Sequence, residues 1–583
     1  MSSDRTRRWA IRLCRQFDGV RATDLVAAVA ELVACNLGAD GFNYAPRDGS
    51  PPQSLVAEVA KHAPSGGWVN PGLVGLVHEQ AASSDERRRR GAWYTPRAVV
   101  QGLIGMATSD GWQPSLVIDP TCGGGAFLLA ALDHLFAQGL TPHDCVARIR
   151  GMDIDHTAVA VSSWSVRLWL LSKGADPDVE VSVVHGNALE QTVPGLADAS
   201  EPVLIAGNPP FASPLKTGVT RSQSCVLGPY ADTAAEHLMR AINTVPNGSR
   251  VVLVQPQSVL SGRDTRAMRA HIDGMAPLHA LWVAREPVFD AGVRACAPLL
   301  VVGERQPDMV RLAAGPMVEP AGERPAQDWG VMGAAALGAP ALPVAMLAPN
   351  DIASPTLGSM VSCTAGFRDE HYGLVAACAE SGLKPDLEDR LVTVGAVDPL
   401  TCWWGLRPIR FGGRKWERPV IDPGQLNAKV RGWFERQHQP KVLLATQSKV
   451  LEPVIDRDGN LVPSTPLIAV HCDPKDIDLI AAVLLAPPVV LWAWGRWFGT
   501  ALASDAIKLA ARQVGELPLP ADNEAWAQAA AIVAKTDPAE PDQAWDQTRL
   551  VAEIMTRAYQ ASSEVFDWWL QRTKPYPAHS SNQ

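Results

Sequence analysis

Four residues with defined chemistry, Asn208, Pro209, Pro210 and Phe211, follow the small apolar run Val203–Gly207 (VLIAG). Proline cannot donate to a sheet ladder and restricts the residue before it, so the run predicts a buried strand ending at this tetrapeptide. Ligands of open α/β sheets bind at the carboxyl ends of strands. An amide, a main-chain carbonyl and an aromatic face fixed there indicate a small planar substrate. The alternative is a loop that only connects two elements.

A glycine-rich turn forms a second candidate site. An apolar strand leads into Asp119 and Pro120, and Gly123-Gly124-Gly125 then open a helix. Glycines let the backbone approach a ligand closely, and the start of a helix offers N–H groups. No Gly-Lys-Ser/Thr follows, so the turn is not a phosphate loop. The alternative is a turn required only for tight packing.

Further strand ends carry polar residues. One predicted strand ends in Asp153 and Asp155, and a short one ends at Gly186-Asn187-Ala188. An acidic residue at the end of the second strand of such a unit commonly receives the hydroxyls of a ribose. Because strands and helices alternate, we expect the α/β class, with a doubly wound, Rossmann-like, mostly parallel sheet.

The loop Gly91–Pro96 (GAWYTP) precedes an amphipathic helix. Thr95 suits the N-cap of this helix, and Pro96 suits its first position. A helix amino terminus favours an anion, so this loop is a third element of the candidate site.

Together these motifs resemble a known family. Asp119–Leu128 (DPTCGGGAFL) resembles the S-adenosyl-L-methionine (AdoMet) motif of class I methyltransferases, and Asn208–Phe211 (NPPF) resembles the catalytic motif of amino-methylating DNA methyltransferases. With Tyr94-Thr95-Pro96 upstream, the motif order is similar to the gamma group of adenine-N6 enzymes from type I and type IIG restriction-modification systems. Val251–Leu260 and Val288–Val302 resemble later strands of that group's sheet, so the resemblance covers about residues 91 to 305.

The resemblance implies AdoMet as cofactor and assigns roles around it. Thr95 would meet the AdoMet carboxylate, Asp153 would hold the ribose, and Ile154 would pack on the adenine. Asn187 stands where many relatives have aspartate, although its amide oxygen could still accept a hydrogen bond. The residues expected to contact AdoMet are Tyr94, Thr95, Pro96, Asp119, Pro120, Cys122, Gly123, Gly125, Phe127, Asp153, Ile154, Asn187, Ala188 and Asn208.

The expected catalytic residues are Asn208, Pro209, Pro210 and Phe211. The exocyclic amine of adenine is a poor nucleophile because its lone pair is delocalised into the ring. The side-chain oxygen of Asn208 and the main-chain carbonyl of Pro209 could accept its two hydrogens, which is catalysis by orientation and electrostatics. Phe211 could stack on the base, which must be flipped from the duplex. A neutral amide has no useful pKa for strong general-base catalysis.

Length and composition restrict the classes of protein to which this chain could belong. At ~150 residues per domain, 583 residues suggest three or four units, and 47% hydrophobic with 19% charged residues is typical of a globular protein. The net charge of −9 argues against indiscriminate coating of nucleic acid but permits a local basic groove. Ten scattered cysteines without CxxC pairs, and no signal-peptide pattern, predict the cytoplasm and no structural zinc. The apolar segment Leu479–Trp494 is short and contains Pro487-Pro488, so we expect it in a core, not a membrane.

We expect five regions along the chain. They are a helical domain at 1–90, a methyltransferase domain at 91–305, an Ala/Pro/Gly-rich linker at 306–350, an α+β target-recognition domain at 351–522 and a helical tail at 523–583. In the first region, Glu58 and Lys61 have ExxK spacing without a convincing upstream aspartate, which indicates helix surface and not a nuclease. The cluster Arg87–Arg90 is compatible with a basic groove or with a solvated face.

Basic residues interleave with aromatic residues in the predicted recognition domain. The stretch Thr401–Arg418 (TCWWGLRPIRFGGRKWER) and the later segments resemble target-recognition domains of the same restriction-modification families. Basic and aromatic residues of this kind could contact DNA phosphates and base edges. The alternative is that Trp403, Trp404, Phe411 and Trp416 belong to a core and the arginines are solvated. The residues expected to contact DNA are Arg407, Arg410, Arg414, Lys415, Trp416, Arg418, Arg496 and Lys508, with Lys441 and Lys449 as weaker candidates.

The leading hypothesis from sequence is a site-specific, AdoMet-dependent DNA adenine-N6 methyltransferase that acts on double-stranded DNA. We expect a role in restriction-modification, phage defence or epigenetic marking, with possible nuclease or other defence subunits as partners. One alternative is a methyltransferase acting on RNA or on a protein glutamine. Another is a DNA- and AdoMet-binding component of a defence complex without turnover. The long region after residue 340 favours DNA, and the intact Asn208 favours turnover.

Overall fold

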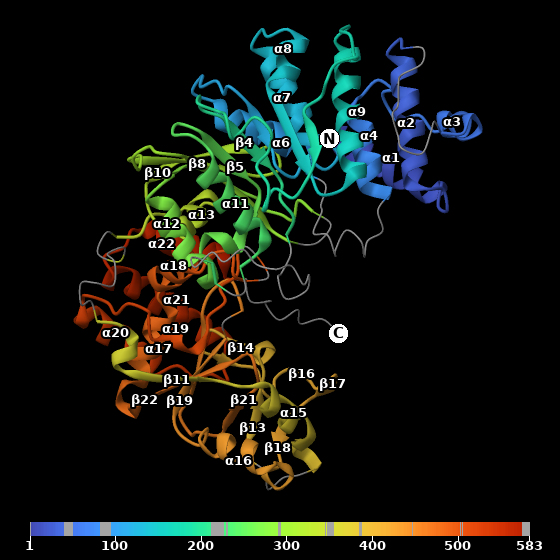
Figure 1. Ribbon diagram of the computed structural model, residues 1–583. Helices are drawn as coiled ribbons and strands as arrows, with labels where there is room; N and C mark the ends of the chain where they lie inside the picture. The colour runs from blue at the N-terminus through green and yellow to red at the C-terminus, as the bar shows by residue number, and fades with distance from the viewer. Residues whose placement is uncertain are drawn as a thin grey trace. The chain divides into compact units, whose positions relative to one another are not determined.

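The chain divides into two units, Met1–Leu337 and Gly338–Gln583 (Figure 1). The computed structural model describes residues 2–39, 51–81, 95–211, 227–228, 231–289, 293–343, 346, 355–383, 388–445, 447–501, 503 and 505–573. Tyr94 and Arg87–Arg90 therefore lie outside the described residues.

A ten-stranded sheet forms the centre of the first unit, in the order β10-β9-β7-β8-β5-β4-β1-β2-β3, with β6 paired to β8. Strands β1 to β5 are parallel, and β8 runs antiparallel to both β5 and β7. The predicted doubly wound α/β sheet is confirmed, including later strands where β5, β6 and β8 lie. The strands are β1 (Val117–Asp119), β2 (Ile149–Asp153), β3 (Val183–His185), β4 (Leu204–Gly207), β5 (Arg250–Leu253), β6 (Gln255–Pro256), β7 (Leu278–Val283), β8 (Ala295–Val301), β9 (Met309–Ala314) and β10 (Glu319–Pro325).

Helices cover the sheet and bury a common core. Val100 and Leu103 of α6, Leu128 of α7 and Trp169 of α9 join buried strand residues such as Trp282 in one cluster. Apolar residues recur at helical spacing in α6 and α7, which explains why these segments form helices with one face on the sheet. The helices are α6 (Arg97–Thr108), α7 (Ala126–Ala137), α8 (Pro142–Ala147), α9 (His156–Ser172), α11 (Thr233–Thr244), α12 (Arg266–Asp273) and α13 (Trp329–Ala336), with 3-10 turns η1 (Gln257–Leu260) and η2 (Arg263–Thr265).

The amino-terminal region is helical, as predicted. Its helices are α1 (Ser2–Gln16), α2 (Ala22–Asn36), α3 (Gln53–Ala60) and α4 (Gly72–Ala81). Their core continues into α9 through Val161, Trp164 and Leu168. Glu58 and Lys61 form an exposed ion pair of 2.6 Å, which confirms helix surface at this position.

The expected linker at 306–350 is wrong for most of its length. Residues 309–336 form β9, β10 and α13, and β9 pairs parallel to β7 in the main sheet. Buried Val310, Leu312 and Trp329 tie this segment to the first unit. Strand β10 is an edge strand with mostly exposed residues, so it lacks the alternation that marks a half-buried strand.

The second unit is α+β, as predicted. It has two four-stranded sheets, β11-β22-β19-β20 and β12-β18-β13-β21, and two small hairpins, β14-β15 and β16-β17. The strands are β11 (Val361–Ala365), β12 (Cys378–Glu380), β13 (Arg390–Val392), β14 (Val397–Asp398), β15 (Thr401–Cys402), β16 (Ile409–Phe411), β17 (Arg414–Trp416), β18 (Pro419–Ile421), β19 (Lys441–Ala445), β20 (Glu452–Asp456), β21 (Leu461–Pro463) and β22 (Ile468–Cys472).

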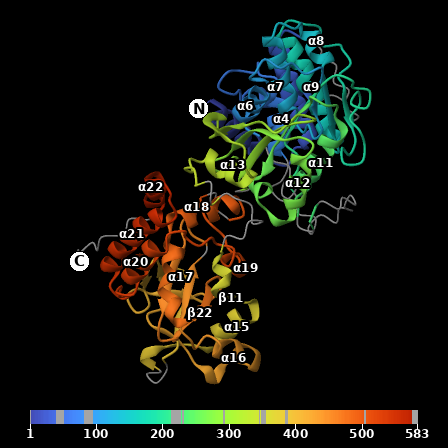
Figure 2. The same ribbon diagram turned by 90° about the vertical axis from the view of Figure 1, so that its left-hand side faces the viewer.

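Helices α17, α20 and α21 pack side by side in this unit (Figure 2). The helices are α15 (Arg368–Ala377), α16 (Ala428–Glu435), α17 (Ile477–Leu485), α18 (Pro487–Arg496), α19 (Ala511–Val514), α20 (Asn523–Val533), α21 (Pro541–Ala558) and α22 (Ser563–Arg572). The apolar segment Leu479–Trp494 is buried in α17 and α18, as expected. Within the described residues, no single helix is both long and apolar enough for a membrane span, and only the segments 474–485 and 487–496, bent by 64°, pass as a pair.

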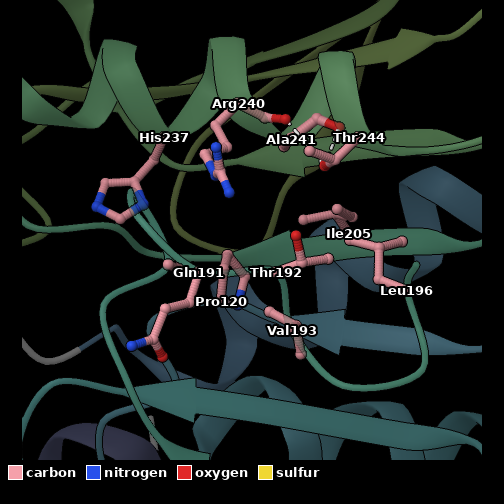
Figure 3. A pocket seen from close by; sticks show the side chains of 11 residues that line it. Pro120, Gln191, Thr192, Val193, Leu196, Ile205, His237, Arg240, Ala241 and Thr244 are labelled. Carbon is pink, nitrogen blue, oxygen red and sulfur yellow. Dashed lines mark hydrogen bonds between the residues drawn. The ribbon is translucent and has the colours of Figure 1, made fainter. Parts of the chain in front are cut away.

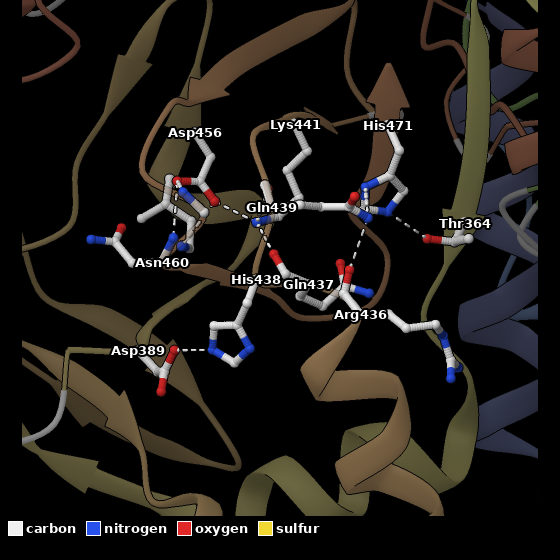
Figure 4. Close-up of polar contacts among 12 residues, drawn as sticks. Thr364, Asp389, Arg436, Gln437, His438, Gln439, Lys441, Asp456, Asn460 and His471 are labelled. Atoms are coloured by element: carbon white, nitrogen blue, oxygen red, sulfur yellow. Dashed lines mark hydrogen bonds and ion pairs between the residues drawn. The ribbon is translucent and has the colours of Figure 1, made fainter. Parts of the chain in front are cut away.

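A buried ion pair joins two strands of the second unit. The ammonium group of Lys441 in β19 binds the carboxylate of Asp456 in β20 and donates to the Gln437 carbonyl at 2.6 Å (Figure 4). Asp456 also accepts from the backbone N–H groups of Gly459 at 2.9 Å and Leu461 at 3.0 Å. Lys441 is fully buried, so the structure contradicts its expected contact with DNA.

Candidate active site

The candidate residues meet at one edge of the sheet. Strand β1 lies between β4 and β2, all three run parallel, and β3 follows β2. Their carboxyl ends therefore share one edge, where the glycine turn, Asp153, Asn187 and Asn208 follow β1, β2, β3 and β4 respectively. The strand order reverses between β1 and β4, which is the topological switch point where such sheets bind ligands.

The glycine turn has the backbone geometry that requires glycine. Gly123 has φ +50° and Gly125 has φ +86°, in the left-handed region that other residues rarely adopt. The Gly123 N–H donates to Asp153 Oδ2 at 2.8 Å, and the Asp155 N–H donates to Asp153 Oδ1 at 2.9 Å. Asp153 thus fixes the turn as well as its own loop.

The residues around this turn fit AdoMet. No atom lies within 4 Å of a Cβ built at Gly123, so the turn presents open space to a ligand. Ile154 is 69% exposed immediately after Asp153, and an exposed apolar side chain beside a carboxylate suits a nucleoside. A carboxylate offers about four lone-pair sites, so the two backbone bonds of Asp153 are compatible with a ribose contact.

Asp119 is buried at the end of β1 and accepts the Thr121 N–H at 3.0 Å. Burial raises the pKa of Asp119 to about 8, the Thr121 N–H opposes this rise, and the charge of Asp153 adds to it. The carboxyl is therefore mainly protonated at neutral pH. A Cβ built at Gly207 would lie 2.5 Å from Asp119 Oδ1, so glycine at this position leaves room for the Asp119 carboxyl between β1 and β4.

Asn208 is held by a residue far away in sequence. Its Nδ2 donates to Thr95 Oγ1 at 2.9 Å, and Thr95 is buried. With the amide nitrogen directed at Thr95, the amide oxygen Oδ1 points elsewhere. The predicted helix cap is wrong, because Pro96 is the N-cap of α6 and the first helical residue is Arg97. The Thr95 hydroxyl is engaged with Asn208 instead of capping the helix.

Two residues outside the predicted site support the NPPF segment. Phe289 packs edge-on against Phe211 with ring centroids 5.7 Å apart and an interplanar angle of 82°. Thr233, at the start of α11, donates through Oγ1 to the Pro210 carbonyl at 2.7 Å. That bond uses the Pro210 carbonyl and not the Pro209 carbonyl expected to bind the substrate amine. Phe289 falls within Val288–Val302, which the sequence marked only as a later strand, and Thr233 lies in no motif, so no sequence signal assigned this role to either residue.

Two expected cofactor contacts have side chains in the core. Cys122 is buried beneath the turn, where its sulfur lies 3.5 Å from the Ser162 hydroxyl oxygen, and Phe127 is 3% exposed in α7. These side chains pack inside the sheet layer because the helix that begins at Ala126 turns its apolar face inward. Only their main-chain atoms are placed to meet a ligand.

A small cavity lies beside the candidate site and is too small for AdoMet. Its volume is about 20 Å³, room for about one water, and Pro120, Ala188, Ile205 and His237 are among its lining residues (Figure 3). Burial lowers the pKa of His237 to about 4, so this imidazole is neutral. Pro120 and Ala188 thus face this cavity.

Asn187 forms a local turn. Its side-chain oxygen accepts the Leu189 N–H at 3.1 Å. An amide oxygen has two lone pairs, so the expected contact with the cofactor adenine stays a prediction.

The basic residues of the second unit divide into two groups. The hairpin β16-β17 turns at Gly412 and Gly413, which have φ +56° and +79°. Arg410 and Lys415 face each other across it, so they share one exposed face of a two-stranded ribbon, while Phe411 is buried opposite. Arg414, Arg418 and Lys508 are also exposed.

The second group is engaged within the protein. Arg407 stacks on the Trp403 ring at 4.3 Å and donates to the Gly395 carbonyl at 2.7 Å, and Arg496 lies over the Trp492 ring at 5.1 Å. The Trp416 indole donates to the Phe411 carbonyl at 3.1 Å. The Lys449 ammonium lies 2.8 Å from the Asp505 carboxylate. These contacts favour structural roles for their side chains.

Comparison with known proteins agrees with the geometry. Residues 75–292 match the family described as N-6 DNA Methylase. The chain is 25% identical over 206 residues to the methylase subunit of the type I restriction enzyme StySPI from Salmonella potsdam, and 23% identical over 199 residues to the EcoEI methylase subunit from Escherichia coli. These matches cover 34% and 33% of this chain and only 37% and 38% of the two relatives.

One solved structure matches nearly the whole fold. The type IIL restriction-modification enzyme MmeI, in complex with DNA, aligns with 99% of this chain and 96% of its own chain at a TM-score of 0.61 and 12% identity. The resemblance to adenine-N6 methyltransferases of restriction-modification systems is confirmed by the match of residues 75–292 to the N-6 DNA Methylase family. That family implies AdoMet as the methyl donor.

Proposed function

We propose that the protein is a site-specific DNA methyltransferase that moves a methyl group from AdoMet to the N6 amine of adenine. The observation that carries this proposal is the placement of Asn208-Pro209-Pro210-Phe211 immediately after β4, which pairs with the strand β1 that leads into the glycine turn. Hydrogen-bond acceptors for the substrate amine and the proposed AdoMet site therefore lie at the same edge of the sheet.

The chain's own residues orient the amine. Thr95 Oγ1 takes the Asn208 Nδ2 hydrogen, which directs the Asn208 oxygen toward a second donor such as the substrate amine. The Pro209 carbonyl accepts the other amine hydrogen. The two acceptors hold the nitrogen lone pair toward the methyl group without a covalent intermediate.

AdoMet supplies an electrophilic methyl group on a sulfonium when bound. Asp153 binds the ribose, Ile154 covers the adenine, and the Gly123 and Gly125 backbone lies along the methionine portion. Thr95 and Asp119 lie toward the methionine end, with Asn187 near the cofactor adenine. These assignments follow the resemblance of the motifs to class I methyltransferases, and they are supported by the common position of these residues at the ends of β1 to β3 and in the segment before α6.

The target adenine must leave the duplex to reach this edge. Phe211 is partly buried, and its ring is braced edge-on by Phe289 at 5.7 Å. A braced ring loses little freedom when a base stacks on it, so Phe211 forms the stacking face for a flipped adenine.

The second unit supplies DNA recognition in this proposal. The hairpin β16-β17 carries Arg410 and Lys415 on one exposed face, and a two-stranded ribbon fits the major groove. Residues 351–522 act as the target-recognition domain, with 523–583 as a helical tail. The similarity to MmeI, a structure containing DNA, supports this assignment.

The proposed setting is restriction-modification, phage defence or epigenetic marking. The similar StySPI and EcoEI proteins are subunits of restriction enzymes, which supports a partnership with nuclease or other defence subunits. The competing proposals are methylation of RNA or protein glutamine, and AdoMet sensing without turnover.

A labelled-methyl experiment separates these candidates. The full chain is incubated with AdoMet bearing a deuterated methyl group and with double-stranded DNA, RNA or a protein extract, and the digested products are analysed by mass spectrometry. We expect label only in N6-methyladenine from DNA. Asn208→Ala should lose at least a hundredfold in rate, whereas Asn36→Ala, a remote exposed asparagine at the end of α2, should keep the wild-type rate. Label in RNA or glutamine, or none at all, would overturn the proposal.

A further inference from the structure

We propose that Gly75 in α4 is a positioning residue for the glycine turn, so that the amino-terminal helices form part of the cofactor site. The inference rests on the proposed binding of AdoMet and names a residue outside every motif of that site. It assigns a function to a region that the sequence marked only as helical.

The backbones of Gly75 and Gly124 are in direct contact. A Cβ built at Gly124 would lie 2.6 Å from Gly75 Cα, and one built at Gly75 would overlap the Gly124 carbonyl oxygen. Real Cβ atoms essentially never make such contacts with backbone, and backbone cannot rotate away as a long side chain can. Helix α4 therefore lies on the turn at a distance that only two glycines permit.

Helix α9 provides a second, independent link to the same turn. Ser162 Oγ donates to the Gly123 carbonyl at 2.7 Å, and Ser165 Oγ donates to the Gly124 carbonyl at 3.4 Å. The neighbouring residues Val161 and Trp164 in the same turn of α9 belong to the core of the amino-terminal helices. The turn is thus supported by α4 and α9, which pack against each other.

This support determines where the N–H groups of the turn point. The carbonyl and the following N–H of a peptide unit point in opposite directions. Because Ser162 holds the Gly123 carbonyl toward α9, the Gly124 N–H points away from α9. The Gly123 N–H meanwhile donates to Asp153 at 2.8 Å. A shift of the turn would change the orientation of the backbone and of Asp153 together.

Gly75→Ala should weaken AdoMet binding, although helix propensity alone would make this substitution favourable. Alanine is a better helix former than glycine, so an α4 that made no contact with the turn would tolerate or favour Gly75→Ala. Here the new methyl group displaces the turn, and a misplacement of ~1 Å in an active site can lower the reaction rate ~100-fold. We expect the Kd for AdoMet to rise about tenfold.

The control is a glycine in a helix of the same unit. Gly105 lies in α6, is exposed, and has no atom within 4 Å of a built Cβ. Gly105→Ala makes the same chemical change without a backbone neighbour, so its AdoMet affinity should equal that of the wild type. Ser162→Ala removes the other link without adding volume, and we expect a severalfold weaker affinity.

The test uses the full-length protein and two readouts. Isothermal titration with AdoMet gives the Kd of the wild type, Gly75→Ala, Ser162→Ala and Gly105→Ala. Hydrogen exchange without ligand follows the amides of residues 121–128, which should exchange faster in Gly75→Ala and Ser162→Ala only. In a methylation assay, Gly75→Ala should raise KM for AdoMet while KM for DNA stays unchanged.

Different results would reject the proposed function and the positioning role of Gly75. Wild-type protein without AdoMet affinity would reject the proposed function, whereas the exchange rates of 121–128 would still decide the role of Gly75. If Gly75→Ala binds AdoMet and protects these amides as Gly105→Ala does, the positioning role is wrong. If Gly75→Ala does not fold, Ser162→Ala decides the question, because unchanged affinity and exchange there would also reject support of the turn by the helices.

Discussion

At the residue scale, the site depends on one amide whose orientation is fixed by a partner 113 positions away in the sequence. Asn208 Nδ2 donates to Thr95 Oγ1 at 2.9 Å. The types and order of Asn208, Asp153 and Gly123 are visible in the sequence because they lie in short motifs. The bond between Thr95 and Asn208 is not visible, because the order of strands in the sheet brings these two residues together.

Thr95→Val tests this orientation. Valine keeps the shape of threonine but cannot accept the amide hydrogen, so Asn208 loses its fixed orientation. We expect kcat for methylation to fall about tenfold to a hundredfold, with a smaller change in KM for DNA. Thr95→Ser retains the hydroxyl and should recover most of the rate. Equal rates for the valine and serine variants would contradict the role of the bond.

Asp119 predicts a pH dependence of cofactor binding. Burial raises its pKa to about 8, so the free site holds a protonated carboxyl at pH 7. Cationic groups at the methionine end of AdoMet favour the ionised form, so binding should release a proton and tighten as pH rises from about 6 to 8. Titration in buffers of different ionisation enthalpy measures that release. Asp119→Asn should remove it, and proton release that persists in this variant would assign it to another group.

At the element scale, the sequence predicted where the central parallel strands end. It did not predict the edge strand of the sheet or the residues that pack against the NPPF segment. Strand β4 is short, apolar and buried, so its composition identifies it. Strand β10 is an edge strand with Pro, Gly and charged residues, and its sequence (EPAGERP) is typical of a loop. Support of the NPPF segment by Thr233 and Phe289 depends on tertiary packing and left no local pattern.

The hairpin β16-β17 yields a prediction for DNA binding. Arg410→Ala and Lys415→Ala should each weaken binding to double-stranded DNA and lower the slope of log K against log salt by about 1, because each would remove one proposed phosphate contact. Fluorescence anisotropy over a series of salt concentrations measures both quantities. Lys535→Ala, at an exposed site in the same unit, should leave the slope unchanged. Identical slopes for all three variants would remove the hairpin from the interface.

At the scale of the whole molecule, the chain has two compact units. In the proposed function the first unit transfers the methyl group and the second recognises DNA. Composition predicted a globular protein of several units, but it placed a linker where β9, β10 and α13 extend the first unit. The first unit is also larger than its motifs suggest, because α4 and α9 connect the amino-terminal helices to the glycine turn.

The buried pair of Lys441 and Asp456 predicts how the second unit responds to mutation. Asp456→Ala leaves a buried ammonium without its carboxylate, which should destabilise that unit by about 3 to 5 kcal/mol. Hydrogen exchange in urea, followed separately for peptides of each unit, measures this loss. AdoMet affinity should stay at the wild-type value. Equal destabilisation of both units would show that they unfold as one.

The central claim is methylation of adenine at a defined sequence by this chain. Modification-sensitive sequencing of unmethylated DNA, after incubation with AdoMet and the full-length protein, tests it most directly. The account predicts N6-methyladenine at one recurrent motif with the wild type and none with Asn208→Ala. Unmodified DNA with the wild type, or the same marks with Asn208→Ala, would contradict it.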